Sequence, residues 1–275
     1  MSRSPRKQRL ALGIGVDDMT LLTMDSGKTL CSIALDAYVK DASAPEGAEW
    51  LSCLAGLVTQ AGIDGGVELH VTVADHWSRY WMQAVPDGIG QLAELRTLSA
   101  ARFESLFGLK AEAWSIAADW QSSGLVLACA MPRSLVEALR NPPHDVWSLA
   151  TLQPASVRAL SRNASKFPAE GWVLCSSSTG ITLFQISNAR VCHVRRHPTT
   201  GVPTVPMIEA LIEAEILRRN ASSKGDLHVF GRLRGNLPGE QLAGLRIVLP
   251  RQDKKRAAAG TGPESYDLGW QGVVA

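Results

Sequence analysis

The chain has 275 residues, of which 45% are hydrophobic and 20% are charged, and its formal net charge is +2. This composition is typical of a globular protein large enough to bury a sizeable core, and it excludes an intrinsically disordered chain. The sequence predicts a cytoplasmic protein, because it shows no signal peptide and no run of about 20 apolar residues that could cross a membrane. The basic clusters contain no interleaved aromatic residues, so nucleic-acid binding is not expected.

Three short strands separated by tight turns are predicted at residues 10–16, 20–24 and 29–35. Their apolar and β-branched residues lie between turns rich in Asp, Ser and Gly. A helix is predicted at 46–61, with its apolar residues on one side and glycines after its end. A strand at 67–74 completes this part of the chain.

A compact α+β unit is predicted between residues 79 and 140, in the order strand, helix, strand, strand, helix. Its elements are expected at residues 79–85, 91–107, 113–118, 125–131 and 134–140. The longer helix presents one apolar face, formed by Leu92, Leu95, Phe103 and Leu106. A further strand at 145–152 and a helix at 155–166 follow.

The pattern of three strands recurs at residues 172–176, 181–186 and 190–195, which predicts a second half built like the first. A loop at 197–206, an amphipathic helix at 207–219 and strands at 227–230 and 245–249 are expected after it. Glu215 falls within the apolar stripe of that helix, and we interpret it as a carboxylate at the rim of the helix that pairs with Arg218 or Arg219.

The sequence predicts neither a catalytic residue nor a metal site. Gly27-Lys28-Thr29 is similar to the end of a P-loop, but Leu22 stands where a glycine is required and a strand follows instead of a helix. His193 and His197 have a spacing that could ligate a metal on a helix, yet their segment is strand-like. The serine run at 176–178 lacks the nucleophile motif Gly-x-Ser-x-Gly.

The order of meander, α+β unit, second meander, helix and strand ending in glycine resembles the actin-like (ASKHA) superfamily. Within it, the chain is similar to cytoplasmic assembly proteins of bacterial type IV pili and type II secretion, namely PilM and the cytoplasmic domain of GspL. The resemblance implies an α/β (α+β) fold with two RNase H-like lobes and a small inserted α+β subdomain. It divides the chain into lobe I (1–165, with the insertion at about 77–140), lobe II (166–250), a flexible basic loop (251–264) and a closing segment (265–275).

The nucleotide motifs of that superfamily are eroded in this chain. Where active members have Gly-Ile-Asp-x-Gly-Thr, Gly15 replaces the aspartate and Asp17 replaces the glycine. Asp17 and Asp18 would repel a triphosphate unless a metal intervened. Serines stand in the second phosphate turn, and Arg232 replaces one glycine of the adenosine motif. The positions that the resemblance assigns to this eroded site are Asp17, Asp18, Ser177, Ser178, Gly180 and Gly231.

The resemblance implies a non-catalytic scaffold without cofactor at the cytoplasmic face of the inner membrane. Such a scaffold links a membrane-anchored protein of the PilN or GspM kind to an assembly ATPase of the PilB or GspE kind. Ile208, Leu211 and Glu215 are candidate partner-binding residues. One alternative is a divergent ATPase or kinase that binds Mg-ATP between the lobes through Asp17 or Asp18. Another is a binding or regulatory domain unrelated to pili.

Overall fold

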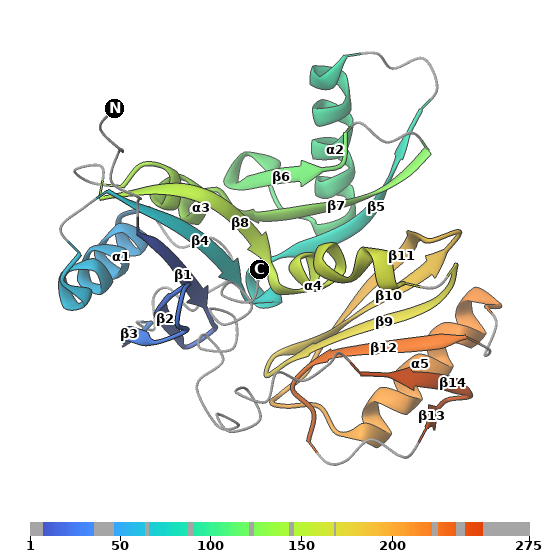
Figure 1. The fold of residues 1–275 in the computed structure, drawn as a ribbon. Helices are drawn as coiled ribbons and strands as arrows, with labels where there is room; N and C mark the ends of the chain where they lie inside the picture. The colour runs from blue at the N-terminus through green and yellow to red at the C-terminus, as the bar shows by residue number, and fades with distance from the viewer. Residues whose placement is uncertain are drawn as a thin grey trace, which may run out of the picture.

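The computed structural model describes residues 8–35, 47–63, 66–86, 91–120, 124–142, 146–167, 169–221, 225–234 and 240–249. Their strands form three sheets of five, six and three strands. Figure 1 shows one lobe on the left, a second lobe at the lower right and a smaller unit at the upper right. The expected loop at 251–264 and closing segment at 265–275 lie outside the described residues.

Lobe I contains β1 (Arg9–Ile14), β2 (Asp18–Thr23), β3 (Thr29–Ala34), β4 (Val67–Val73) and β8 (Trp147–Pro154). These strands are arranged in the order β3-β2-β1-β4-β8. β1 pairs antiparallel with β2 and parallel with β4, which in turn pairs parallel with β8. Two helices that contact each other, α1 (Gly47–Ala61) and α3 (Arg133–Arg140), bury apolar residues in the core of this lobe.

Lobe II repeats this topology. Its strands are β9 (Glu170–Ser177), β10 (Gly180–Ser187), β11 (Arg190–Pro198), β12 (Asp226–Gly231), β13 (Gln241–Leu242) and β14 (Leu245–Val248). They are arranged in the order β11-β10-β9-β12-β14-β13, with β9 antiparallel to β10 and parallel to β12. The first five positions match the order of lobe I, so the repeated meander does mark two lobes of the same design.

The inserted unit consists of β5 (Arg79–Val85), α2 (Leu92–Phe107), β6 (Trp114–Ala118) and β7 (Gly124–Pro132). Its sheet has the order β5-β7-β6, and an aromatic cluster of Trp81, Phe103 and Trp114 fills the space between this sheet and α2. The short helices η1 (Asp75–Trp77), η2 (Ala111–Ala113), α4 (Ala155–Asn163) and η4 (Ala164–Lys166) complete the connections.

The strands β9 and β10 of lobe II are buried on both faces along nearly their whole length. On β9, Trp172 and Leu174 belong to the core that includes α5 (Val205–Arg219). Val173 and Cys175 alternate with them and pack on the opposite side, against α4 and the inserted sheet. The insertion is therefore fixed to lobe II by packing, although it is connected to lobe I in sequence.

The structure refines one expectation about the insertion and corrects another. The helix at 134–140 contacts β6 and β7 of the insertion, but Leu135 and Leu139 of α3 are part of the core of lobe I. Leu92 and Leu106 are exposed, although the helical spacing placed them on a buried face. Both lie near the ends of α2, and the buried residues of this helix are Leu95, Ser99 and Phe103.

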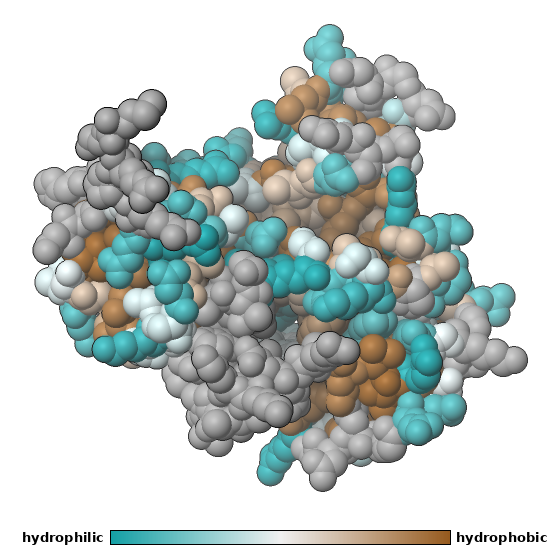
Figure 2. Space-filling model, viewed as in Figure 1, coloured by the Kyte–Doolittle hydropathy of each residue, from teal (hydrophilic) through white to brown (hydrophobic). Residues whose placement is uncertain are grey.

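Figure 2 shows hydrophilic side chains over α4 and an apolar area over β12. None of the helices within the described ranges is long and apolar enough to cross a membrane.

Replacing Phe103 by alanine should lower the free energy of unfolding by about 3–5 kcal/mol, because the side chain is fully buried in the aromatic cluster. Leu106→Ala on the same helix is the matched control, and its exposed side chain predicts a change within about 0.5 kcal/mol. Urea unfolding followed by tryptophan fluorescence measures both. Equal effects of the two substitutions would contradict the packing described.

Candidate functional site

The turn after β1 is closed by its own backbone and anchored by an indole. Gly15 N donates to the carbonyl of Asp18, and Leu35 N donates to the carbonyl of Asp17, both at 2.8 Å. The carbonyl of Gly15 accepts a hydrogen bond of 2.7 Å from Nε1 of the fully buried Trp77. The turn that the resemblance assigns to phosphate is thus attached to η1, the short helix that follows β4.

Asp75, in the same short helix, places a carboxylate where the two lobes and the insertion meet. Its side chain is only 5% exposed. Oδ1 accepts from Tyr80 Oη at 2.6 Å and from Ser156 N at 3.1 Å. Oδ2 accepts from Thr182 Oγ1 at 2.8 Å and from Ser156 Oγ. The four donors come from β5 of the insertion, from the first turn of α4 and from β10 of lobe II.

All four donors to Asp75 are neutral, so a buried charge is stabilised here by hydrogen bonds and by the amino-terminal end of α4. Burial, followed by the Asp75 charge, raises the pKa of Cys129 to about 12 and raises the pKa of Cys175 as well. The same two causes raise the pKa of Tyr80 well above its ordinary value. These groups therefore remain protonated at neutral pH, as burial disfavours their charged forms.

Asp75 was not singled out from the sequence. The one local signal is a carboxylate directly after the predicted strand at 67–74. Its partners Ser156 and Thr182 lie 81 and 107 positions away, which no local pattern can indicate.

The second turn and the strand-ending glycines have structural reasons for their residues. Ser177 Oγ donates to the carbonyl of Gly180 at 3.2 Å and accepts from Thr179 N at 3.3 Å, which closes the turn between β9 and β10. Ser178 is half-buried in the same turn. A Cβ at Gly180 would lie 2.9 Å from the carbonyl oxygen of His197 on the neighbouring strand.

Gly231 approaches β9 more closely than any other residue type could. Its φ is +96°, and an added Cβ would lie 1.9 Å from the carbonyl oxygen of Ser176. Ser176 Oγ donates to the carbonyls of Phe230 and Arg232, at 3.2 and 2.6 Å. Ser176, Gly231 and Arg232 are therefore brought together within lobe II.

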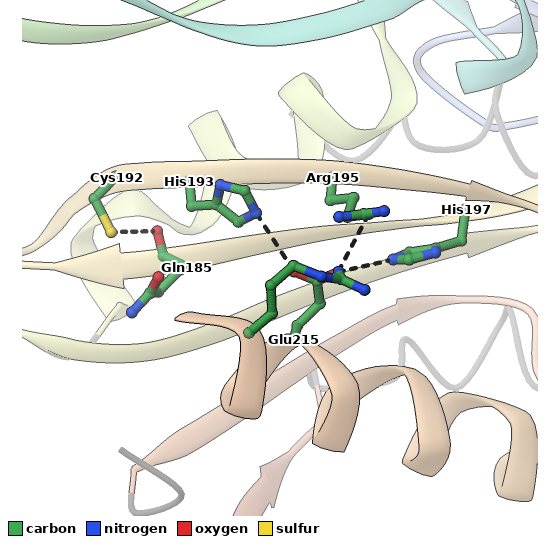
Figure 3. A network of polar contacts seen from close by, with 7 residues as sticks. Gln185, Cys192, His193, Arg195, His197 and Glu215 are labelled. Carbon is green, nitrogen blue, oxygen red and sulfur yellow. Dashed lines mark hydrogen bonds and ion pairs between the residues drawn. The ribbon is translucent and has the colours of Figure 1, made fainter. Parts of the chain in front are cut away.

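Glu215 forms a second buried charge, and here the partners are cations (Figure 3). Its side chain is 0% exposed between α5 and β11. Arg218 Nη1 and Arg195 Nε contact Oε1, the latter at 3.2 Å. His193 Nε2 lies 3.6 Å from Oε2, and His197 Nε2 lies 3.5 Å from Oε1. His193, Arg195 and His197 alternate along β11 and so share one face of the strand.

The structure confirms the pair with Arg218 but corrects the position of Glu215, which is buried and not at the rim of the helix. Figure 3 shows the two imidazoles on opposite sides of the carboxylate, with Arg195 between them. Among the residues that the structure describes, no three His, Cys, Asp or Glu side chains are placed to hold a metal ion.

The candidate partner-binding residues lie on the inner side of α5. Ile208 and Glu215 are fully buried against the sheet, and Leu211 is half-buried. Neither Ile208 nor Glu215 offers its side chain to a partner in this structure, which corrects the expectation for both. The apolar stripe read from the sequence is the face that packs in the core of lobe II.

Comparison with solved structures gives the class of fold. A chain of the PilM–PilN type IV pilus biogenesis complex aligns over 97% of this chain and 98% of its own, with a TM-score of 0.59 and 13% identity. A Bacteroides thetaiotaomicron protein with an actin-like ATPase fold and unknown function aligns over 82% of this chain and 83% of its own, with a TM-score of 0.55 and 10% identity. The fold is actin-like.

The cytoplasmic domain of EpsL, an inner membrane component of the type II secretion system of Vibrio cholerae, aligns over 98% of this chain and 96% of its own. Its TM-score is 0.49 and its identity 9%. Neither a protein-family model nor a curated protein matches the amino-acid sequence. At these identities the comparisons establish the fold alone, as the order of sheets and insertion had indicated.

We expect the hydrogen bond between Asp75 and Thr182 to couple the lobes energetically. A double-mutant cycle with Asp75→Asn and Thr182→Val should give an interaction energy of about 0.5–3 kcal/mol in urea unfolding, because the two side chains share one buried bond. Pairing Asp75→Asn with Thr97→Val, on the exposed side of α2, is the control and should be additive. Additivity in both cycles would show that this bond does not connect the lobes energetically.

The stability of the protein should fall as the pH drops through the range in which the histidines beside Glu215 titrate. Burial, then nearby arginines, lowers the pKa of His193 and of His197, so the unfolded chain binds these protons more readily. The contribution of the neutral imidazoles to the free energy of unfolding is fully present above about pH 6.5. It is lost as the pH falls through the lowered pKa values.

The measurement is urea unfolding between about pH 7.5 and 5, for the natural chain and for the double variant His193→Gln and His197→Gln. The variant should lose less stability over this range. A variant whose stability changes with pH as steeply as that of the natural chain would contradict the assignment.

Proposed function

We propose that the chain is a non-catalytic, actin-like scaffold of a type IV pilus or type II secretion platform. In this function it works at the cytoplasmic face of the inner membrane. It links a membrane-anchored protein of the PilN or GspM kind to an assembly ATPase of the PilB or GspE kind, and it needs no nucleotide.

The first support for the proposal is the extent of the likeness to pilus proteins. The chain from the PilM–PilN complex aligns over almost the full length of both proteins, insertion included. A partner-binding function needs surfaces of defined shape, and it does not need an intact phosphate site.

The observation that carries the non-catalytic part of the proposal is the Asp75 junction. Its buried carboxylate is bonded at once to lobe II, to α4 and to the insertion. Asp17 and Asp18 add carboxylates at the turn that is anchored by the same short helix. A triphosphate between the lobes would have to be accommodated near this negative charge and these fixed contacts.

The alternative is an enzyme of the same fold that holds Mg-ATP. Asp17 and Asp18 favour it, since carboxylate oxygens are suitable ligands for Mg²⁺. Its site would be formed by residues of both lobes, namely Asp17, Asp18, Ser177, Ser178, Gly180 and Gly231.

Two measurements on the full chain test the proposal. We expect titration calorimetry with Mg-ATP to give no binding in the micromolar range. We also expect the chain to capture the cytoplasmic tail of a PilN- or GspM-like protein of the same bacterium, and to do so equally without nucleotide. Micromolar binding of Mg-ATP that is lost in Asp17→Asn would favour the enzyme. Failure to capture any such tail, or the assembly ATPase, would contradict the scaffold.

A further inference from the structure

Helix α5 is apolar on its outer side as well as on its inner side. Met207, Ala210, Ala214 and Leu217 follow one another at spacings of three and four residues, and so line one face. All four are exposed; Met207 is 39% exposed and Leu217 80%. The apolar stripe of an amphipathic helix normally faces another part of the protein and not water. Within the part of the chain that the structure describes, this outer stripe (Met207–Ala210–Ala214–Leu217) is not covered.

Arginines border the outer stripe on the side of β11. Arg218 follows Leu217 on the helix, and Arg195 reaches the same carboxylate from the strand. They are 48% and 43% exposed, although each contacts the fully buried Glu215. With Arg195 and Arg218 set against Glu215, the border carries a net charge of +1.

Glu215 acts as a positioning residue for these arginines. It contacts Arg195 through Nε and Arg218 through Nη1, so each guanidinium keeps further N–H donors for an external carboxylate. A guanidinium already held in place loses less conformational entropy when it binds an anion. Burial of Glu215 therefore gives the surface two oriented arginines beside an apolar stripe.

Carboxylates border the stripe on its other side. Glu209 and Glu213 occupy the helical positions opposite Arg218 across the stripe, and Glu213 is exposed. An anionic membrane would bring its headgroups against these carboxylates as well as against the arginines. A protein segment can instead place its own acidic side chains toward β11 alone.

We propose that the outer stripe of α5, with Arg195 and Arg218, is a docking surface for an acidic amphipathic helix of a protein partner. The apolar side chains of this helix would pack on Met207, Ala214 and Leu217. Its carboxylates would pair with the two arginines. This goes beyond the proposed function, because it holds for any machine that the chain serves and does not involve the junction of the lobes.

The test uses a fluorescent synthetic peptide of about 20 residues, with leucines on one helical face and glutamates on its flanks. We expect the natural chain to bind it at low salt, and more weakly as salt increases. Leu217→Ser should weaken binding about tenfold, and Arg195→Gln should do the same and reduce the salt dependence. Because Leu217 is largely exposed, its substitution leaves the fold intact.

Matched controls distinguish binding at this surface from nonspecific hydrophobic or electrostatic binding elsewhere. Leu51→Ser removes an exposed leucine of α1, and Arg190→Gln removes an exposed arginine at the other end of β11; both should bind as the natural chain does. A peptide with lysines in place of glutamates should not bind. The proposal would be overturned if the lysine peptide bound as tightly as the glutamate peptide. It would also be overturned if the control substitutions lowered the affinity as much as Leu217→Ser and Arg195→Gln do. Binding to phosphatidylserine vesicles that depends on Leu217 would also overturn it, in favour of a membrane surface.

Discussion

The arrangement of the whole molecule depends on one buried carboxylate. Asp75 has lost its water, and a desolvated charge is tolerated only where its lone pairs are all bonded. Four neutral donors meet this requirement, and they belong to three different parts of the chain. The insertion, the helix α4 and the sheet of lobe II must therefore converge at one point. The rings of Tyr80 and Phe184, with centroids 6.1 Å apart, add an apolar contact between the insertion and lobe II.

This convergence has a consequence for how the lobes can move. A rotation of lobe II away from lobe I would separate Thr182 from Asp75 and would open the apolar contact between the inserted sheet and β9 to β11. Such a rotation would also expose the apolar side chains of this contact to water, which is unfavourable. The architecture favours one relative position of the lobes. A protein of fixed shape suits the proposed function as a scaffold better than a cycle of opening and closing around a nucleotide.

Features that depend on neighbours in sequence could be predicted, and features that depend on distant contacts could not. The strands of both meanders, the order of the insertion and the helix near 207–219 follow from alternation, turn residues and helical spacing, and the structure confirms them. The predictions that the structure corrects or refines concern what an element packs against. Nothing near α3 in sequence shows that Leu135 belongs to lobe I, and nothing near Glu215 shows that β11 covers it. Asp75 was missed for the same reason, since its donors are assembled only by the fold.

Asp75 and Glu215 are both buried carboxylates, and the difference between their partners explains their different effects. Neutral donors hold the Asp75 carboxylate in place without neutralising it, and its charge acts on the interior of the junction, where it contributes to the raised pKa of Cys129. Glu215 is paired with guanidinium groups that are themselves about half exposed, and more positive charge surrounds it than it can balance. The excess charge must face solvent or a partner, and it lies next to the exposed leucine at the end of α5. A carboxylate that stabilises the interior of lobe II thus also determines the charge of the surface above it, and this combination of fixed cations and apolar stripe makes α5 the part of the molecule best suited to recognise an acidic helix.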